Sequence, residues 1–226
     1  MSLYFWLLLG SIVVPLFLSF DKRLRFYRQW KYVLPSIVLV AVIYILVDVY
    51  FTRHGYWGFN DQYLSGIRIF DLPIEECLFF IVVPYASIFL HESILEYFPQ
   101  VKLGKQANNI LSRSLIAGSF LLVVFNTGKS YTLYIFIKLA LVLVLARLLH
   151  SKSIRSFFLT FLVILIPFLI VNGVLTGSFI HDEVVWYNNA ENLEVRIFTI
   201  PVEDFAYAFS MILLNLVLIE RLKKLY

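Results

Sequence analysis

Two pairs of adjacent acidic residues have the types and spacing that acid–base chemistry requires. Glu75 and Glu76 form the first pair, and Glu203 and Asp204 form the second; each begins two residues after a proline, at the start of an apolar run. Burial and a helix N-terminus act on a carboxyl group in opposite directions, so neighbouring acids can divide into one proton donor and one anion. We therefore predict all four as catalytic acids.

The two pairs belong to a repeated motif. Arg68-Ile-Phe-Asp-Leu-Pro-Ile-Glu-Glu76 matches Arg196-Ile-Phe-Thr-Ile-Pro-Val-Glu-Asp204 at an offset of 128 (196 − 68), and Asn60 matches Asn188 at the same offset. Trp57 and Trp186 agree if one residue is inserted. Such self-similarity marks a duplicated unit. For one motif, helix initiation with Asp71 or Thr199 as N-cap would be an equal explanation; duplication favours chemistry.

The elements that must position these acids are transmembrane helices. Of the 226 residues, 61% are apolar and 15% are charged, and the mean hydropathy is +0.83. An ordinary soluble domain is about half apolar and a quarter charged, so a soluble globule is excluded. Because a membrane-spanning helix needs about 20 mostly apolar residues, we predict an all-α integral membrane protein of about seven helices, near 3–20, 32–52, 74–97, 110–128, 130–150, 157–178 and 202–222.

The basic residues predict the orientation. Between these spans, four lie on one side (Arg53, Arg68, Lys129 and Arg196) and fourteen on the other. Cytoplasmic loops carry the excess of Lys and Arg. We expect an outer N-terminus, a cytoplasmic C-terminus, outer loops at 53–73 and 179–200, and a location in a bacterial plasma membrane.

The repeat and the helix count together predict the domain organisation. A first three-helix repeat (1–100) and a second (130–226) would be parallel, because a linker helix (101–129) restores the orientation. Both acidic motifs then meet the same face of one membrane domain.

Further side chains could surround a substrate near the acids. The aromatic candidates would stabilise a cation, although an interfacial aromatic belt explains the two tryptophans and the first tyrosine equally well. Two polar groups lie inside the outer ends of helices. The predicted substrate-binding set is Trp57, Phe79, Phe80, Trp186, Tyr187, Tyr207, Asp48 and Asn172.

Other residues carry weaker signals. Lys138 is either a functional cation or a snorkelling side chain, and His91 should be solvated near a helix end. The single cysteine, Cys77, forms no internal disulfide, and no Cys/His cluster or nucleotide-binding glycine motif occurs. We expect no metal, no cofactor and no nucleic-acid partner.

The chain resembles the lycopene cyclase domain family, in its fused two-repeat form, at 57–60, 72–80, 167–173, 185–188 and 200–204. The resemblance implies redox-neutral, proton-initiated cyclisation of the linear ψ-ends of lycopene to β-ionone rings. It carries the family's acidic positions onto Glu75, Glu76, Glu203 and Asp204, with Asp48 and Asn172 as polar partners. Glu75→Gln and Glu203→Gln should then abolish ring formation. The implied partners are a lipophilic carotenoid substrate, the lipid bilayer and other enzymes of the pathway.

A small-solute transporter is the alternative, because three-plus-one-plus-three parallel repeats also build small sugar transporters. A sugar pathway needs polar groups near the bilayer midplane and broken helices. Here the acids gather at one end, and central segments such as 38–46 are apolar.

Overall fold

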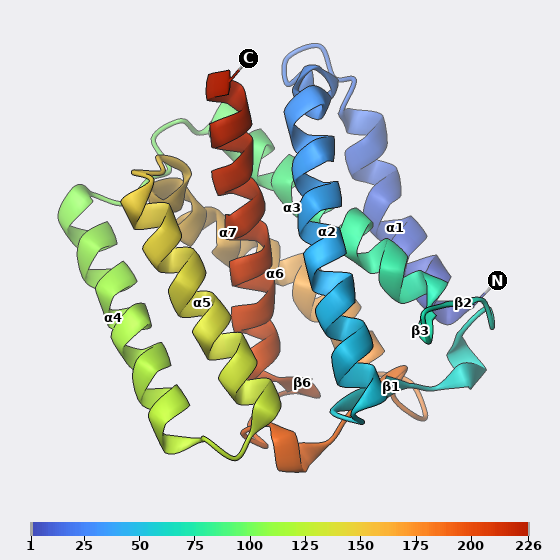
Figure 1. Cartoon of the computed structure of the whole chain (residues 1–226). Helices are drawn as coiled ribbons and strands as arrows, with labels where there is room; N and C mark the ends of the chain where they lie inside the picture. Colours follow the sequence, from blue (N-terminus) through green and yellow to red (C-terminus); the bar gives the residue numbers. More distant parts are fainter. Residues whose placement is uncertain (1, 226) are drawn as a thin grey trace.

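The computed structural model describes residues 2–225, which form seven α-helices (Figure 1). Every predicted helix is present, with both ends within five residues of the prediction. The helices are α1 (Leu3–Leu18), α2 (Trp30–Arg53), α3 (Ile74–Tyr97), α4 (Lys105–Phe125), α5 (Ser130–Leu148), α6 (Ser153–Leu175) and α7 (Val202–Leu225).

Six of these helices, α2 to α7, are long and apolar enough to cross a membrane. The chain is therefore an integral membrane protein. The first helix, α1, is apolar but has only 16 residues. At about 1.5 Å per residue it is shorter than the roughly 30 Å hydrocarbon core, so length and composition support six of the seven predicted spans.

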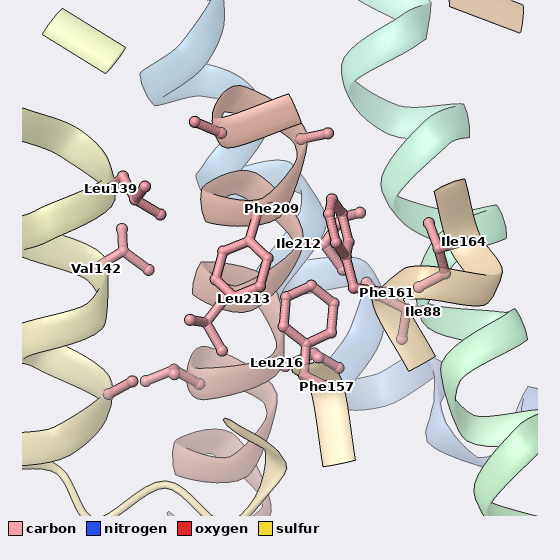
Figure 2. Packing of buried hydrophobic residues seen from close by; sticks show 14 of the residues in the cluster. Ile88, Leu139, Val142, Phe157, Phe161, Ile164, Phe209, Ile212, Leu213 and Leu216 are labelled. Atoms are coloured by element: carbon pink, nitrogen blue, oxygen red, sulfur yellow. The ribbon is translucent and has the colours of Figure 1, made fainter. Parts of the chain in front are cut away.

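The central helix of the bundle is α7. Two thirds (67%) of its apolar window is buried, against 17% for α4, which packs on the outside of α5. Figure 2 shows Phe209 and Leu213 of α7 between Leu139 of α5 and Phe161 of α6. The acidic start of α7 is thus held by the best-packed element of the molecule.

The segments 53–73 and 179–200, predicted as loops, contain short strands and 3₁₀ turns in the same order. The elements are β1 (Trp57–Phe59), a turn at Asp61–Tyr63, β2 (Arg68–Ile69) and β3 (Leu72–Pro73), then β4 (Val185–Tyr187), a turn at Asn189–Glu191, β5 (Arg196–Ile197) and β6 (Ile200–Pro201). They lie at the end of the bundle that carries the N-terminus, whereas the C-terminus lies at the other end (Figure 1).

Strands β1 and β4 pair with each other antiparallel, which joins the two segments directly. Gly58 faces Trp186, and a Cβ atom on Gly58 would lie 2.3 Å from Cζ2 of the Trp186 ring. These two residues are 128 apart (186 − 58), the offset of the acidic motifs. Trp57 therefore corresponds to Val185, and the proposed match of Trp57 with Trp186 through an inserted residue is wrong.

A tight hairpin precedes α3 and α7. Phe70 and Phe198 turn the chain with φ of 50° and 56°, and the arginine two residues earlier donates from Nη1 to the carbonyl that closes each turn, at 2.8 Å in the first hairpin and 2.7 Å in the second. Asp71 pairs with Arg53 in this turn and α3 begins after Pro73, so the predicted N-cap role of Asp71 is wrong. Thr199 likewise binds the hydroxyls of neighbouring residues.

Candidate active site

Glu76 and Asp204, the second acid of each motif, face one shared cavity between the halves of the chain. Their exposed fractions are 8% and 4%. Asp48 of α2 and Asn172 of α6 line the same cavity, whose volume is about 60 Å³. The structure thus gathers polar residues from four helices around one cavity.

The two cavity acids have unequal hydrogen-bond partners. Oε2 of Glu76 accepts one bond, from the Tyr4 hydroxyl of α1 at 2.6 Å. Asp204 accepts three: from Tyr131 of α5, from Tyr187 of β4 at 2.9 Å, and from Nδ2 of Asn172 at 3.3 Å. Hydrogen bonds donated to a carboxylate favour its anionic form, so Asp204 is the better stabilised anion.

Tyr187 belongs to the strand pair rather than to a helix. Burial, and secondarily the neighbouring Asp204, raise the pKa of its hydroxyl well above the usual value of about 10. The hydroxyl therefore keeps its proton and serves as a fixed donor to Asp204.

Aromatic rings form much of the cavity wall. Four residues of the predicted substrate-binding set line it, namely Trp57, Phe79, Tyr187 and Tyr207. The Trp57 ring meets the Tyr131 ring edge-on, with centroids 5.1 Å apart. Because the face of an aromatic ring attracts positive charge, this wall suits a cationic intermediate.

Glu75 and Glu203, the first acid of each motif, do not line the cavity. Oε1 of Glu75 accepts bonds from the Ser2 hydroxyl and the Ser65 amide, at 2.6 and 2.7 Å. Oε1 of Glu203 accepts bonds from the Thr132 hydroxyl and the Leu193 amide, both at 2.7 Å. Each of these glutamates is fully buried and ties the first helix of its half to the strand-bearing segment.

Two of the predicted aromatic contacts also lie away from the cavity. Phe80 is 1% exposed and packs against Tyr44 of α2. Trp186 covers Gly58 and is 39% exposed. Among residues 2–225, neither side chain belongs to the cavity lining.

Three other polar residues that the sequence analysis singled out are buried, namely Asp48, Lys138 and His91. Oδ2 of Asp48 has no hydrogen-bond partner among residues 2–225. The ammonium of Lys138 lies over the rings of Tyr207, Tyr44 and Tyr134, at 3.5, 4.3 and 4.8 Å from their centroids, so Lys138 does not snorkel. His91 is 1% exposed and binds Thr160 at 2.7 Å; the prediction that it is solvated is wrong.

Sequence reasoning missed Tyr4 and Tyr131, which bind the two cavity acids. Each lies near the start of the first helix of its half, and the two are 127 residues apart (131 − 4). This offset differs by one from that of the acidic motifs, which conceals the match in a strict comparison. The sequence did offer one signal for these two tyrosines: each places a hydroxyl at the start of an apolar helix, at the same end of the bundle as the acidic motifs.

A larger apolar groove adjoins the cavity. It has a volume of about 530 Å³, runs between α1, α3 and α6, and shares Phe79, Val83, Phe168, Asn172 and Ala208 with the cavity. Its rim includes Val14 and Leu18, which are exposed on the apolar surface of α1. The groove therefore extends from the apolar surface of the bundle to residues that also line the acid cavity.

Within residues 2–225, no three His, Cys, Asp or Glu side chains converge closely enough to hold a metal ion. The chemistry that the described groups offer is proton transfer from and to carboxyl groups, beside rings that stabilise positive charge.

Comparison with known proteins identifies relatives of this chain. The family model described as lycopene cyclase matches residues 1–94 and 128–222, which include both acidic motifs. The bifunctional lycopene cyclase/phytoene synthase of Aspergillus oryzae is 26% identical over 121 residues, covering 53% of this chain and 19% of that protein. The bifunctional lycopene cyclase/phytoene synthase of Leptosphaeria maculans is 33% identical over 61 residues, covering 26% of this chain and 10% of that protein.

These matches span a fifth or less of the two fungal proteins. No solved structure gives a significant match. The family model, in contrast, covers most of the chain in two separate segments, one in each half. The chain therefore belongs to the lycopene cyclase family.

Proposed function

We propose that the protein is a lycopene β-cyclase, which converts the linear ψ-ends of lycopene to β-ionone rings. One observation carries the proposal: Glu76 and Asp204, from the two halves, are buried together in an aromatic cavity that an apolar groove connects to the lipid-facing surface. Family membership and the membrane-spanning helices support a lipophilic carotenoid substrate.

For each ring, the reaction adds one proton to the substrate and removes another. A carboxylic acid protonates C2 of the terminal C1=C2 alkene, which leaves a cation at C1. The C5=C6 double bond attacks C1, forming the C1–C6 bond and moving the cation to C5. Loss of the C6 proton to a base restores a C5=C6 double bond, so the product is an isomer of the substrate and no oxidant is consumed.

We propose different roles for the two acids, and their contacts support the division. Glu76 accepts a single hydrogen bond, and no bond from residues 2–225 reaches its Oε1, so this oxygen is free to carry the transferable proton. Asp204, held by three donors, supplies the anion that stabilises the cation and receives the ring proton. Glu75 and Glu203 are positioning residues in this scheme, because each acts on the acid beside it through the chain.

We also infer that residues 1–100 and 130–226 are two copies of one unit, joined by residues 101–129. The order of strands, turns and helix is the same in both, and Glu75 and Glu203 accept equivalent amide bonds, from Ser65 and Leu193, at the offset of 128 (193 − 65). The copies would each contribute one acid to the cavity.

A transporter is the competing function. Its substrate would be polar and would cross the bundle, whereas most of the side chains that line the groove beside the acids are apolar. Uptake of a small sugar into vesicles, without pigment chemistry, would favour the transporter.

Expression in a bacterium that accumulates lycopene tests the proposal directly. Chromatography of the pigments should show cyclic products. Membranes supplied with lycopene in D₂O should add one deuterium per ring, because C2 gains a solvent-derived proton while C6 loses its own. Unchanged lycopene in the presence of membrane-inserted protein would refute the proposal, and cyclic product without deuterium would refute the proton-initiated mechanism.

A further inference from the structure

The groove between α1, α3 and α6 continues from the acid cavity toward the other end of the bundle. Near the acids it begins at Phe79, and on the same helix it ends at Tyr97. These residues are 18 apart (97 − 79), about 27 Å along a helix. Small side chains, including Gly10, Ala86 and Ser87, leave its floor open.

At the positions of the second half that correspond to the groove, several of the side chains are larger, and Lys138 is one of them. Tyr4 and Tyr131 play equivalent roles at an offset of 127, which matches Ser11 of the groove with Lys138 (138 − 11). The motif offset of 128 matches Phe79 with Tyr207. In the first half, Ser11 leaves space beside Phe79. In the second half, the Lys138 ammonium occupies the corresponding space beside Tyr207 and lies 3.5 Å from the centre of its ring.

We propose that this groove is a single channel for the extended polyene chain, with one end of the substrate in the acid cavity, and that Lys138 closes the counterpart channel. This proposal rests on the proposed function and adds the position of the polyene part of the substrate. The protein thus handles one end per binding event. A substrate with two ψ-ends must leave the groove and enter again reversed.

The helical rise of α3 gives the distance of each groove residue on this helix from the cavity. Ala86 lies 7 residues beyond Phe79 (86 − 79), about 10 Å, and Ser93 lies 14 residues beyond it (93 − 79), about 21 Å. Both line the groove, and neither contacts the acids. A bulky residue at each point should cut the groove at a different distance from the cavity.

The experiment compares Ala86→Phe and Ser93→Phe on two substrates: lycopene, and a truncated ψ-ended polyene of half its length. Ala86→Phe should slow both substrates. Ser93→Phe should slow lycopene alone, by about 10- to 200-fold, the range over which pocket contacts of methylene size discriminate. The matched control is Ile137→Phe, on the exposed apolar surface of α5 outside the groove, which should leave both rates unchanged.

Equal slowing of both substrates by Ser93→Phe, or no slowing by either groove variant at normal membrane accumulation, would overturn the channel. A wild-type protein that cyclises neither substrate would instead refute the proposed function.

A second measurement uses the unaltered protein and does not depend on the variants folding. With lycopene in large excess, free one-ring product should exceed the amount of enzyme before any two-ring product forms. Two-ring product that appears from the start, without free one-ring product, would overturn handling of one end per binding event.

Discussion

Replacing Glu76 by glutamine should separate the catalytic acids from the positioning acids. The amide keeps an oxygen that can accept the Tyr4 bond but has no transferable proton. General acid catalysis contributes about 10²–10⁴-fold, or roughly 3–5 kcal/mol at 1.36 kcal/mol per factor of ten. Ring formation should fall by at least about 100-fold, while the protein still folds.

Glu75→Gln should give the opposite pattern, in contrast to the loss of ring formation expected from the sequence, because Glu75 does not line the cavity. One oxygen of the amide can keep both bonds, from Ser2 and Ser65. The new NH₂ group replaces Oε2, which has no partner among the described residues, so a buried donor is left unsatisfied. Such a group costs about 1–3 kcal/mol, and this cost should appear in thermal stability in detergent rather than in the rate per folded molecule.

The assay is cyclic carotenoid formed per membrane-inserted protein, measured by pigment chromatography and immunoblotting. Glu96→Gln, at the exposed far end of α3, is the control for losing a surface carboxylate and should match wild type. If Glu75→Gln abolished turnover at normal accumulation while Glu76→Gln cyclised normally, the assignment of Glu76 as the acid would be refuted, and the first acid of each motif would take its place.

Three further predictions concern other parts of the molecule. Lys138→Met, which keeps the length of the side chain and removes its amino group, should retain cyclisation at normal membrane accumulation, because Met fills the same space beside the rings of Tyr44, Tyr134 and Tyr207 and a buried nitrogen without a hydrogen-bond partner among residues 2–225 is removed; loss of activity at normal accumulation would give Lys138 a chemical role instead. Gly58→Ala should destabilise the protein by about 1–3 kcal/mol through overlap with Trp186, and adding Trp186→Ala should recover most of the loss; thermal denaturation of the single and double variants measures this. In a Cys77→Ser background, a cysteine at Gln62 should react with an impermeant maleimide from outside intact cells, and one at Lys102 only after lysis; the reverse pattern would overturn the predicted orientation.

The helices were predictable because lipid imposes one dominant requirement, a run of apolar residues long enough to cross it. Apolar composition therefore located each helix to within five residues at both ends. The helix α1 shows the limit of this criterion, since its 16 residues are too few to cross the hydrocarbon core. The strands were not predictable. β1 and β4 are three residues each, and they are specified by pairing with each other across 128 positions of sequence.

The acids of the site were predictable as a group but not individually. Glu75 and Glu76 are neighbours with the same chemistry, and only the direction in which each side chain leaves α3 separates them. Glu75 meets an amide in its own loop, whereas Glu76 meets the cavity. That difference depends on the hairpin that precedes α3. The geometry of this hairpin cannot be predicted from the spacing of apolar residues. The role of Lys138 was hidden for a related reason, because its partners come from three helices.

The pairing of Gly58 with Trp186 bears on how such a molecule could have arisen. If the halves descend from one self-associating chain, the ancestral dimer placed this position opposite its own copy, on the symmetry axis. Two tryptophans could not both lie there, since the ring already occupies the space of a single Cβ atom on the opposite strand. An arrangement with a large side chain on one strand and no side chain on the other became possible only after the two copies could mutate independently. The present side chains would then permit the pairing of the two halves and disfavour association of the second half with itself.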